Sequence, residues 1–322
     1  MTIPGHAFHD LLKPRAGMLE EVLAGLAKPQ KEIPPKYFYD ARGCELFEEI
    51  CGLPEYYPTR AELAIMRKHA HAMAGLLGAR CALIEIGCGN SEKSRLLLEV
   101  LQPAVFVAID IAREQLETSC SALAEALPGI KLVAVRADFT QPIALPIAEL
   151  RQAHRRVLYF PGSTIGNFNP AEAREFLSRW ALLLGAGGGA LIGVDLKKDR
   201  ALLDAAYNDA RGVTADFNLN TLRHINRVLG ADFDLAAFRH HAFYNPGQGR
   251  IEMHLVSLRP QRVTVGGRVI AFHAGETINT EISCKYGIAE FQQIGRDAGF
   301  EPVQCWTDDD GRFSVHYFTL PQ

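Results

Sequence analysis

The sequence predicts an α/β protein built on a doubly wound, largely parallel sheet, and two observations support this fold class. Short apolar runs of strand length alternate with helix-forming segments, at residues 81–86, 104–109, 131–136, 156–160 and 190–194. Continuous apolar runs are typical of strands that are buried on both faces. Glycines or acidic residues follow these runs at their carboxyl ends, which form the edge where open α/β sheets bind ligands.

The first run leads into a glycine turn, where Gly87, Gly89 and the start of a helix form a cradle for a ligand. Small residues let the backbone approach a ligand closely, and N–H groups at a helix start point toward it. A dinucleotide-binding loop has a third glycine, and that position is Glu92 here. A carboxylate would repel a pyrophosphate, so the turn disfavours nicotinamide and flavin cofactors. The pattern acid-x-Gly-x-Gly instead resembles the first motif of S-adenosylmethionine-dependent methyltransferases, whose ligand has no phosphate.

Acidic residues follow the second and third runs. Asp110 comes some twenty residues after the glycines, at the strand end where ribose hydroxyls are held in this kind of fold. Asp138 is placed to accept from an adenine amino group, and Phe139 to cover a ring face. Either aspartate alone would be interpreted as an ordinary loop cap. Their joint placement favours a nucleoside site.

The N-terminal segment and a later insertion are predicted to form a second, α+β domain. Two groups of tyrosines flanked by prolines precede the first run, and we interpret them as a lid or a substrate wall. After the fifth run, two helical segments and a series of antiparallel strands interrupt the alternation. We therefore predict a cofactor-binding domain from residues 61–196 plus 286–322, and a substrate-binding domain from residues 1–60 plus 197–285.

Composition excludes several classes of protein. The chain has 322 residues and a net charge of −3, so it shows no electrostatic footprint for nucleic acid or an anionic membrane. No apolar run reaches the length of a membrane helix, and the N-terminus lacks the pattern of a signal peptide. Seven cysteines form no C-x-x-C pair, and their odd number argues against a complete disulfide framework. We expect a cytoplasmic protein.

Two pairs of histidines raise the question of a metal site. His69 and His71 are two residues apart, and His240 and His241 are adjacent. Neither pair has the acidic or cysteine neighbours that a metal site needs. We expect no bound metal.

Six dispersed motifs resemble the histidine Nα-methyltransferases of ergothioneine biosynthesis, in the same order and over nearly the whole chain. They are Leu-Pro-Glu-Tyr-Tyr-Pro-Thr-Arg (53–60), Glu-Ile-Gly-Cys-Gly-Asn-Ser-Glu-Lys (85–93), Gly-Ser-Thr-Ile-Gly-Asn (162–167), Ala-Tyr-Asn-Asp-Ala-x-Gly-Val-Thr (206–214), Arg-Ile-Glu-Met (250–253) and Glu-Ile-Ser-Cys-Lys (281–285). The resemblance implies a Rossmann-like class I methyltransferase sheet with S-adenosylmethionine as methyl donor.

The resemblance also implies which residues form the site. The positions expected to bind the methyl donor are Tyr39, Gly87, Lys93, Asp110, Asp138 and Phe139. The positions expected to bind histidine are Tyr56, Asn167, Tyr207, Met253, Glu281 and Ser283. Tyr39 and Asn167 are also the expected catalytic residues, because weak acceptors can orient an amine lone pair and pass its proton to water. Glu281 and Ser283 are two apart on one predicted strand, so they point to the same face and can bracket an imidazole edge.

The implied activity is three successive methyl transfers to the α-amino nitrogen of L-histidine, giving Nα-trimethylhistidine, or hercynine. We expect a monomer that needs no metal. Two alternatives stay open: methylation of another amino acid such as a tryptophan derivative, and a non-catalytic protein that kept the cofactor cradle. A carboxylate at position 281 is poorly matched to the bulk of an indole, and intact residues at all the expected positions argue against loss of catalysis.

Overall fold

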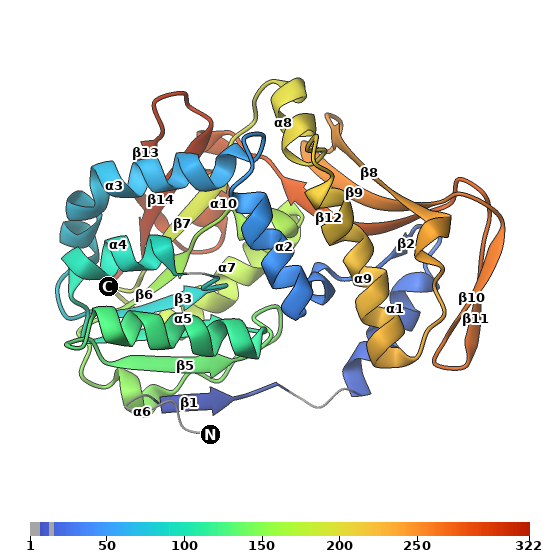
Figure 1. The fold of residues 1–322 in the computed structure, drawn as a ribbon. Coiled ribbons are helices and arrows are strands. Elements are labelled where there is room, and N and C mark those ends of the chain that lie inside the picture. The colour runs from blue at the N-terminus through green and yellow to red at the C-terminus, as the bar shows by residue number, and fades with distance from the viewer. Residues whose placement is uncertain (1–6, 13–15, 90) are drawn as a thin grey trace. The chain divides into compact units, whose positions relative to one another are not determined.

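The computed structural model describes residues 7–12, 16–89 and 91–322, and these divide into two compact units (Figure 1). Unit 1 comprises the described residues up to Leu12 together with Pro58–Lys197 and Cys284–Gln322. Unit 2 comprises residues 16–57 together with Lys198–Ser283.

Unit 1 contains a predominantly parallel sheet, which confirms the predicted doubly wound fold. Among the described residues it has eight strands in the order β1-β5-β4-β3-β6-β7-β14-β13. β14 is antiparallel to both of its neighbours, β7 and β13. The strands are β1 (Ala7–Asp10), β3 (Ala82–Ile86), β4 (Val105–Asp110), β5 (Leu132–Arg136), β6 (Arg156–Phe160), β7 (Gly189–Asp195), β13 (Glu301–Thr307) and β14 (Phe313–Thr319).

The strand order reverses at β3, which determines where this sheet can bind a ligand. β3 pairs in parallel with β4 on one side and with β6 on the other. The carboxyl ends of β3 and β6 therefore flank a topological switch point, the place where doubly wound sheets bind their ligands.

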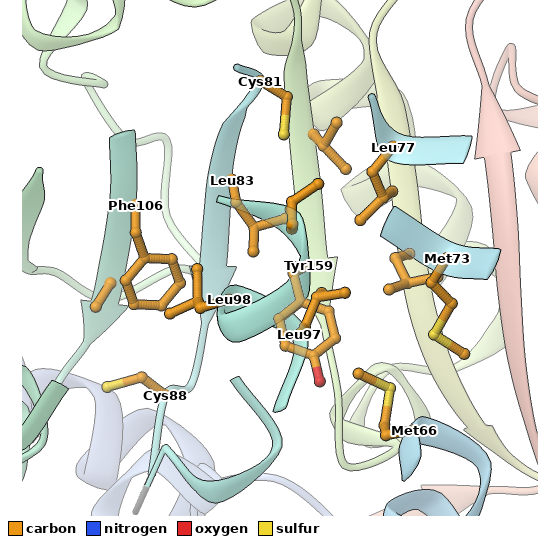
Figure 2. Packing of buried hydrophobic residues seen from close by; sticks show 14 of the residues in the cluster. Met66, Met73, Leu77, Cys81, Leu83, Cys88, Leu97, Leu98, Phe106 and Tyr159 are labelled. Carbon is orange, nitrogen blue, oxygen red and sulfur yellow. The ribbon is translucent and has the colours of Figure 1, made fainter. Parts of the chain in front are cut away.

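Helices cover the sheet through apolar side chains. The helical segments of unit 1 are α3 (Tyr57–Leu77), α4 (Glu92–Leu101), α5 (Arg113–Ala126), α6 (Ile147–Leu150), η2 (Thr164–Asn167), α7 (Pro170–Leu184) and α10 (Ile288–Asp297). Figure 2 shows Met73 and Leu77 of α3 in one buried cluster with Leu97 of α4, Leu83 of β3 and Phe106 of β4. Local sequence signals define the start of α7: Asn169 caps the helix, Pro170 is its first residue and Glu172 completes a capping box.

Unit 2 combines a small sheet with helices. Its strands are β2 (Lys31–Glu32), β8 (Phe238–Asn245), β9 (Arg250–Ser257) and β12 (Thr277–Cys284), in the sheet order β2-β12-β9-β8, and the hairpin β10 (Gln261–Val265) with β11 (Arg268–Phe272). Its helical segments are α1 (Ala16–Leu26), η1 (Pro35–Phe38), α2 (Ala41–Cys51), α8 (Arg200–Ala206), α9 (Val213–Leu229) and η3 (Leu235–Ala237). Apolar residues of α9, including Leu222 and Ile225, are buried with Leu255 of β9 and Ile278 of β12.

The structure corrects the predicted boundary at the N-terminus. The sequence reading assigned all of residues 1–60 to the second domain, but β1 pairs in parallel with β5 at the edge of the unit 1 sheet. β1 is a four-residue edge strand with one exposed and three half-buried residues, so it carries no continuous apolar run that would reveal it.

Candidate functional site

The turn after β3 holds both of its glycines in the left-handed region of backbone space, with φ of 69° at Gly87 and 47° at Gly89. Glycine adopts this conformation without the steric cost that a side chain brings. The N–H of Gly87 donates to the Ile109 carbonyl at 2.8 Å, and the Ser119 hydroxyl donates to the Gly89 carbonyl. A Cβ atom at either glycine would meet nothing within 4 Å, so the turn has open space beside its backbone.

Asp110 ends β4 beside this turn. Its carboxylate accepts from the Ala112 N–H at 2.9 Å and from the Cys88 thiol at 3.9 Å. Burial raises the pKa of Asp110, while the backbone N–H groups of Ala112 and Gly89 oppose that shift. The structure therefore brings Asp110 and the glycine turn together, as the sequence predicted for a nucleoside site.

Asp138 and Phe139 follow β5. Asp138 accepts from the backbone N–H of Thr140 at 3.0 Å and from its hydroxyl at 2.6 Å, so it does cap its own turn. The Phe139 ring lies edge-on to Phe160 and Phe176, with centroids 5.8 and 6.4 Å away. These contacts fix the orientation of the loop that carries both residues.

Lys93 and Asn167 lie in the helical segments that follow β3 and β6 at the switch point. Lys93 is in the first turn of α4, and its ammonium group lies 2.6 Å from the carboxylate of Glu62 on α3. Asn167 is the last residue of η2 and is half-buried. η2 follows two residues with left-handed backbone, Gly162 with φ of 76° and Ser163 with φ of 58°.

In unit 2, three of the predicted tyrosines belong to one aromatic cluster. The ring of Phe47 lies edge-on to Tyr39 on one side and to Tyr56 on the other, with centroids 5.7 and 6.3 Å away. Tyr207 lies edge-on to Tyr56 at 6.3 Å, and Phe217 lies 5.8 Å from Tyr39. The proline-flanked segments of the N-terminus thus meet the inserted helices through their rings.

Glu281 lies close to this cluster. Burial raises the pKa of Tyr56 well above its usual range, and the charges of Tyr207, Glu281 and Tyr39 contribute to the same shift. Glu281 is itself half-buried, and its carboxylate is near enough for its charge to act on Tyr56. Unit 2 therefore brings together Tyr39, Tyr56, Tyr207 and Glu281.

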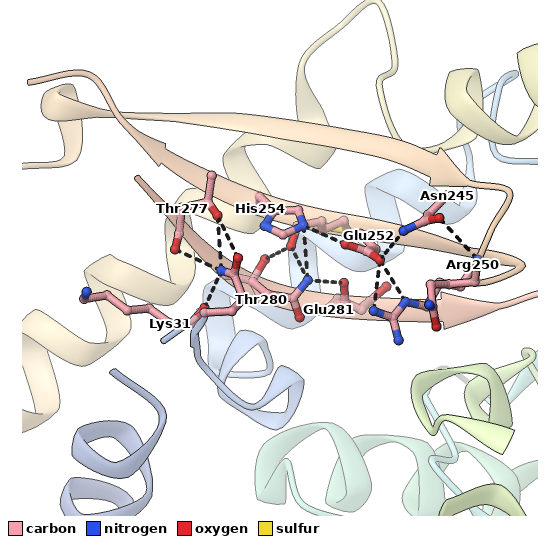
Figure 3. Close-up of polar contacts among 12 residues, drawn as sticks. Lys31, Asn245, Arg250, Glu252, His254, Thr277, Thr280 and Glu281 are labelled. Carbon is pink, nitrogen blue, oxygen red and sulfur yellow. Dashed lines mark hydrogen bonds and ion pairs between the residues drawn. The ribbon is translucent and has the colours of Figure 1, made fainter. Parts of the chain in front are cut away.

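Met253 and Ser283 are buried on neighbouring strands. Met253 packs in the same apolar cluster as Tyr207, and its carbonyl accepts from the Thr280 hydroxyl at 3.2 Å and the Asn279 amide at 3.3 Å. Figure 3 shows these polar contacts beside Glu281, whose carbonyl accepts from the Asn279 amide at 3.4 Å. Side chains of β12 thus hold the backbone of β9 at Met253.

Sequence reasoning missed Glu62. It lies on the apolar face of α3, four residues before Met66, and only 1% of it is exposed. An acidic residue at a buried position of a helical stripe is the signal that could have revealed it.

The described residues contain neither a membrane-spanning helix nor a cluster of metal ligands. In this part of the chain, no helix has the length and apolar character needed to cross a membrane. Within the same residues, no group of three or more histidine, cysteine, aspartate or glutamate side chains is arranged to hold a metal ion.

Comparison with known proteins gives consistent matches. The family described as histidine-specific, SAM-dependent methyltransferases matches residues 18–320. The histidine N-alpha-methyltransferases of Mycolicibacterium smegmatis and Mycobacterium tuberculosis are 42% and 41% identical, each over 92% of this chain and 92% of its own length. Ergothioneine biosynthesis protein 1 of Neurospora crassa is 33% identical over 86% of this chain and 32% of its own length. Because the family match spans nearly the whole sequence, this chain belongs to the histidine-specific, S-adenosylmethionine-dependent methyltransferases.

Proposed function

We propose that this S-adenosylmethionine-dependent methyltransferase acts on the α-amino nitrogen of L-histidine and adds three methyl groups in succession, giving hercynine for ergothioneine biosynthesis. The observation that carries the proposal is the tyrosine cluster of unit 2, in which Tyr56 and Tyr207 lie edge-on and the charge of the half-buried Glu281 acts on Tyr56. An imidazole offers an N–H for such a carboxylate and a flat ring for its apolar neighbours. The family match to histidine-specific enzymes supports the same substrate.

The residues at the switch point of unit 1 fit the methyl donor. The open space beside Gly87 and Gly89 admits a ligand close to the backbone, and Asp110 is placed at the strand end that binds ribose hydroxyls. Asp138 and Phe139 are assigned to the adenine, and Lys93 to the same donor site. The donor supplies its methyl group from a positively charged sulfonium.

Methyl transfer from a sulfonium needs a neutral amine in line with the methyl group, and it needs no strong base. An α-amino group has a pKa near 8 in peptides, and the site has to take the substrate amine in its neutral form. Correct positioning alone can supply roughly 7–11 kcal/mol of the barrier in favourable cases. We assign this positioning to the Tyr39 hydroxyl and the Asn167 side-chain carbonyl, which orient the lone pair and pass the released proton to water.

The other predicted residues are assigned to holding the substrate. Tyr56, Tyr207 and Asn167 are the proposed partners of its amino and carboxylate groups. Glu281 and Ser283 are proposed to bind the two imidazole nitrogens, with Met253 lining the pocket. Each added methyl removes one N–H from the amine. An acidic residue beside the amine would hold its protonated form and stop the series early, and the proposal assigns no such residue.

One assay tests the function. The purified chain is incubated with S-adenosylmethionine and each amino acid in turn, and mass spectrometry counts the methyl groups added. We expect trimethylated product from histidine alone. Turnover of tryptophan or a derivative instead would identify an enzyme for another amino acid, and donor binding without any turnover would identify a binding protein. A cytoplasmic location and a monomeric state are part of the same proposal.

A further inference from the structure

Glu62 is a buried acid to which the proposed function gives no role. It lies in the second turn of α3, on the same face as the buried residues Met66 and Met73. Removing a carboxylate from water is costly unless charged or N–H partners replace the lost hydration. Two such partners come from segments at the switch point of the sheet, and each of those segments carries a residue of the proposed site.

The first partner is Lys93, directly after the glycine turn. Its Nζ lies 2.6 Å from Oε2 of Glu62, and the lysine side chain is itself only 20% exposed. The ion pair therefore fixes the beginning of α4 against α3. Lys93 is one of the residues proposed to bind the methyl donor.

The second partner is the backbone of Gly162, in the loop after β6. Its N–H donates to both carboxylate oxygens of Glu62, at 2.9 Å to Oε2 and 3.1 Å to Oε1. Gly162 and Ser163 both have left-handed backbone, which is unfavourable for a serine and has to be held by surrounding contacts. The same loop continues into η2 and ends at Asn167.

The sheet leaves room for this carboxylate at one position. A Cβ atom added to Gly193 on β7 would lie 2.1 Å from Oε1 of Glu62, closer than any real contact. A Cβ added to Gly162 would lie 3.5 Å from Nζ of Lys93, so the lysine also lies close to the loop. The carboxylate thus lies where α3, α4, β7 and the loop after β6 meet.

We propose that Glu62 is a positioning residue for methyl transfer, which through one carboxylate sets both Lys93 and the loop that carries Asn167. The inference rests on the proposed function, in which Lys93 serves the donor and Asn167 the amine. Two separate effects follow. The charge of Glu62 governs donor affinity through Lys93, and its acceptor oxygens govern turnover through Gly162 and Asn167.

Two variants separate these effects. Glu62→Gln keeps an oxygen for the Gly162 N–H but loses the charge opposite Lys93, whereas Glu62→Ala loses both. The control is Arg67→Gln, which breaks the exposed ion pair of 3.2 Å between Arg67 of α3 and Glu92 of α4 and leaves the loop untouched. The measurements are binding of S-adenosylhomocysteine by calorimetry, kcat and KM for histidine, and hydrogen exchange of residues 162–167.

We expect Glu62→Gln to weaken S-adenosylhomocysteine about tenfold while exchange of the loop stays near wild type. We expect Glu62→Ala to lower kcat by roughly a hundredfold relative to wild type, because small displacements of positioning groups cost that much. The same variant should speed hydrogen exchange in residues 162–167. Arg67→Gln should leave all of these values within about twofold of wild type.

A folded Glu62→Ala variant with wild-type kcat and wild-type exchange in the loop would overturn the inference. Equal losses in both Glu62 variants would also overturn it, because charge balance alone would then explain the residue. If the alanine variant does not fold, unchanged S-adenosylhomocysteine affinity in Glu62→Gln is sufficient to refute the role. A wild-type chain that methylates no histidine would instead refute the proposed function, while the binding and exchange measurements still decide the role of Glu62.

Discussion

A carboxylate withdrawn from water needs N–H groups in place of the lost hydration, and Asp110 has such donors. Burial raises its pKa, but several backbone N–H groups, including those of Ala112 and Gly89, act in the opposite direction. The side chain is held in one orientation by these contacts. In the proposed donor site, it would therefore accept from the ribose hydroxyls without further ordering.

Asp110→Ala should weaken binding of the methyl donor by roughly 1–3 kcal/mol, because the hydrogen bonds to the ribose are lost. Calorimetry with S-adenosylmethionine measures this directly. Asp309→Ala is the control, since Asp309 pairs with the exposed Lys68 and takes no part in the proposed site. Undiminished affinity in Asp110→Ala would remove Asp110 from the donor site.

Glu281 is proposed to select the substrate through its imidazole. Loss of one partner in a charge-assisted, largely buried pair costs about 2–5 kcal/mol. Glu281→Ala should thus lower kcat/KM for histidine by roughly two orders of magnitude and leave donor binding intact. Steady-state kinetics on histidine and tryptophan measure the effect. The matched control is Glu276→Ala, which removes an acid that pairs with Lys31 just before the same strand.

Near-wild-type turnover of histidine by Glu281→Ala would place the side-chain pocket elsewhere.

The residue-level predictions came from motif positions, and the structure adds contacts that no motif contains. Glu62 was missed because its partners, Lys93 and Gly162, are 31 and 100 positions away in the sequence. The pattern of α3 could reveal that Glu62 is buried, but its partners depend on how α3 packs against the sheet, which that pattern does not show.

At the scale of elements, a buried carboxyl group joins β3 to α4. The Ser94 hydroxyl on α4 donates to Glu85 on β3 at 2.6 Å. Burial raises the pKa of Glu85 from its ordinary value of 4.5 to about 8, although Ser94 and Lys93 oppose the shift. Glu85 therefore carries a proton in the folded protein at neutral pH.

This shift makes folding stability depend on pH. Between about pH 4.5 and pH 8 the folded chain holds a proton on Glu85 that the unfolded chain has released. The folded state binds more protons in this window, so its stability falls as the pH rises. Glu85→Gln removes this titration. As the pH rises from 5 to 8, we expect the free energy of unfolding of Glu85→Gln to increase by about 3 kcal/mol relative to that of wild type.

Urea unfolding of both proteins at pH 5 and pH 8 measures the gain. Glu99→Gln is the control, because Glu99 forms an exposed pair with Arg95 on the same helix. Its effect on stability should be small at both values. A difference between Glu85→Gln and wild type that does not change with pH would contradict the raised pKa.

Within the large sheet of unit 1, the parallel strands that the sequence located most clearly are those buried on both faces. β3 and β7 consist entirely of buried residues, so a continuous apolar run revealed each of them. β13 was missed because it is an edge strand in which exposed and buried residues mix without a clean alternation. Edge strands owe their pairing to the neighbouring strand more than to their own composition, which limits what a local pattern can predict.

At the scale of the molecule, backbone hydrogen bonds and a buried ion pair connect the segment that leaves unit 1 with the segment that returns to it. The chain leaves unit 1 after Lys197 and returns at Cys284. Leu196 and Tyr286 form a parallel bridge there, and the N–H of Lys197 donates to the Tyr286 carbonyl at 3.0 Å. Beside the bridge, the Lys285 ammonium lies 2.7 Å from the Asp195 carboxylate, and both side chains are buried.

Breaking this ion pair should strongly destabilise the protein, although neither of its residues belongs to the proposed binding sites. Lys285→Met removes the cation that faces a fully buried carboxylate, and breaking a buried pair in this way costs about 3–5 kcal/mol. Thermal unfolding measures the loss. Adding Asp195→Asn to Lys285→Met should recover much of it, because the uncompensated charge is then gone as well.

The control for Lys285 is a lysine from the other connection. Lys197 pairs with Glu290 at 2.7 Å, but both side chains are more than 40% exposed. Lys197→Met should therefore cost less than about 1 kcal/mol. If Lys197→Met and Lys285→Met destabilised the protein equally, burial would not be the reason for the strength of the Asp195–Lys285 pair. If the double variant were no more stable than Lys285→Met alone, the penalty would come from lost packing and not from the stranded charge of Asp195.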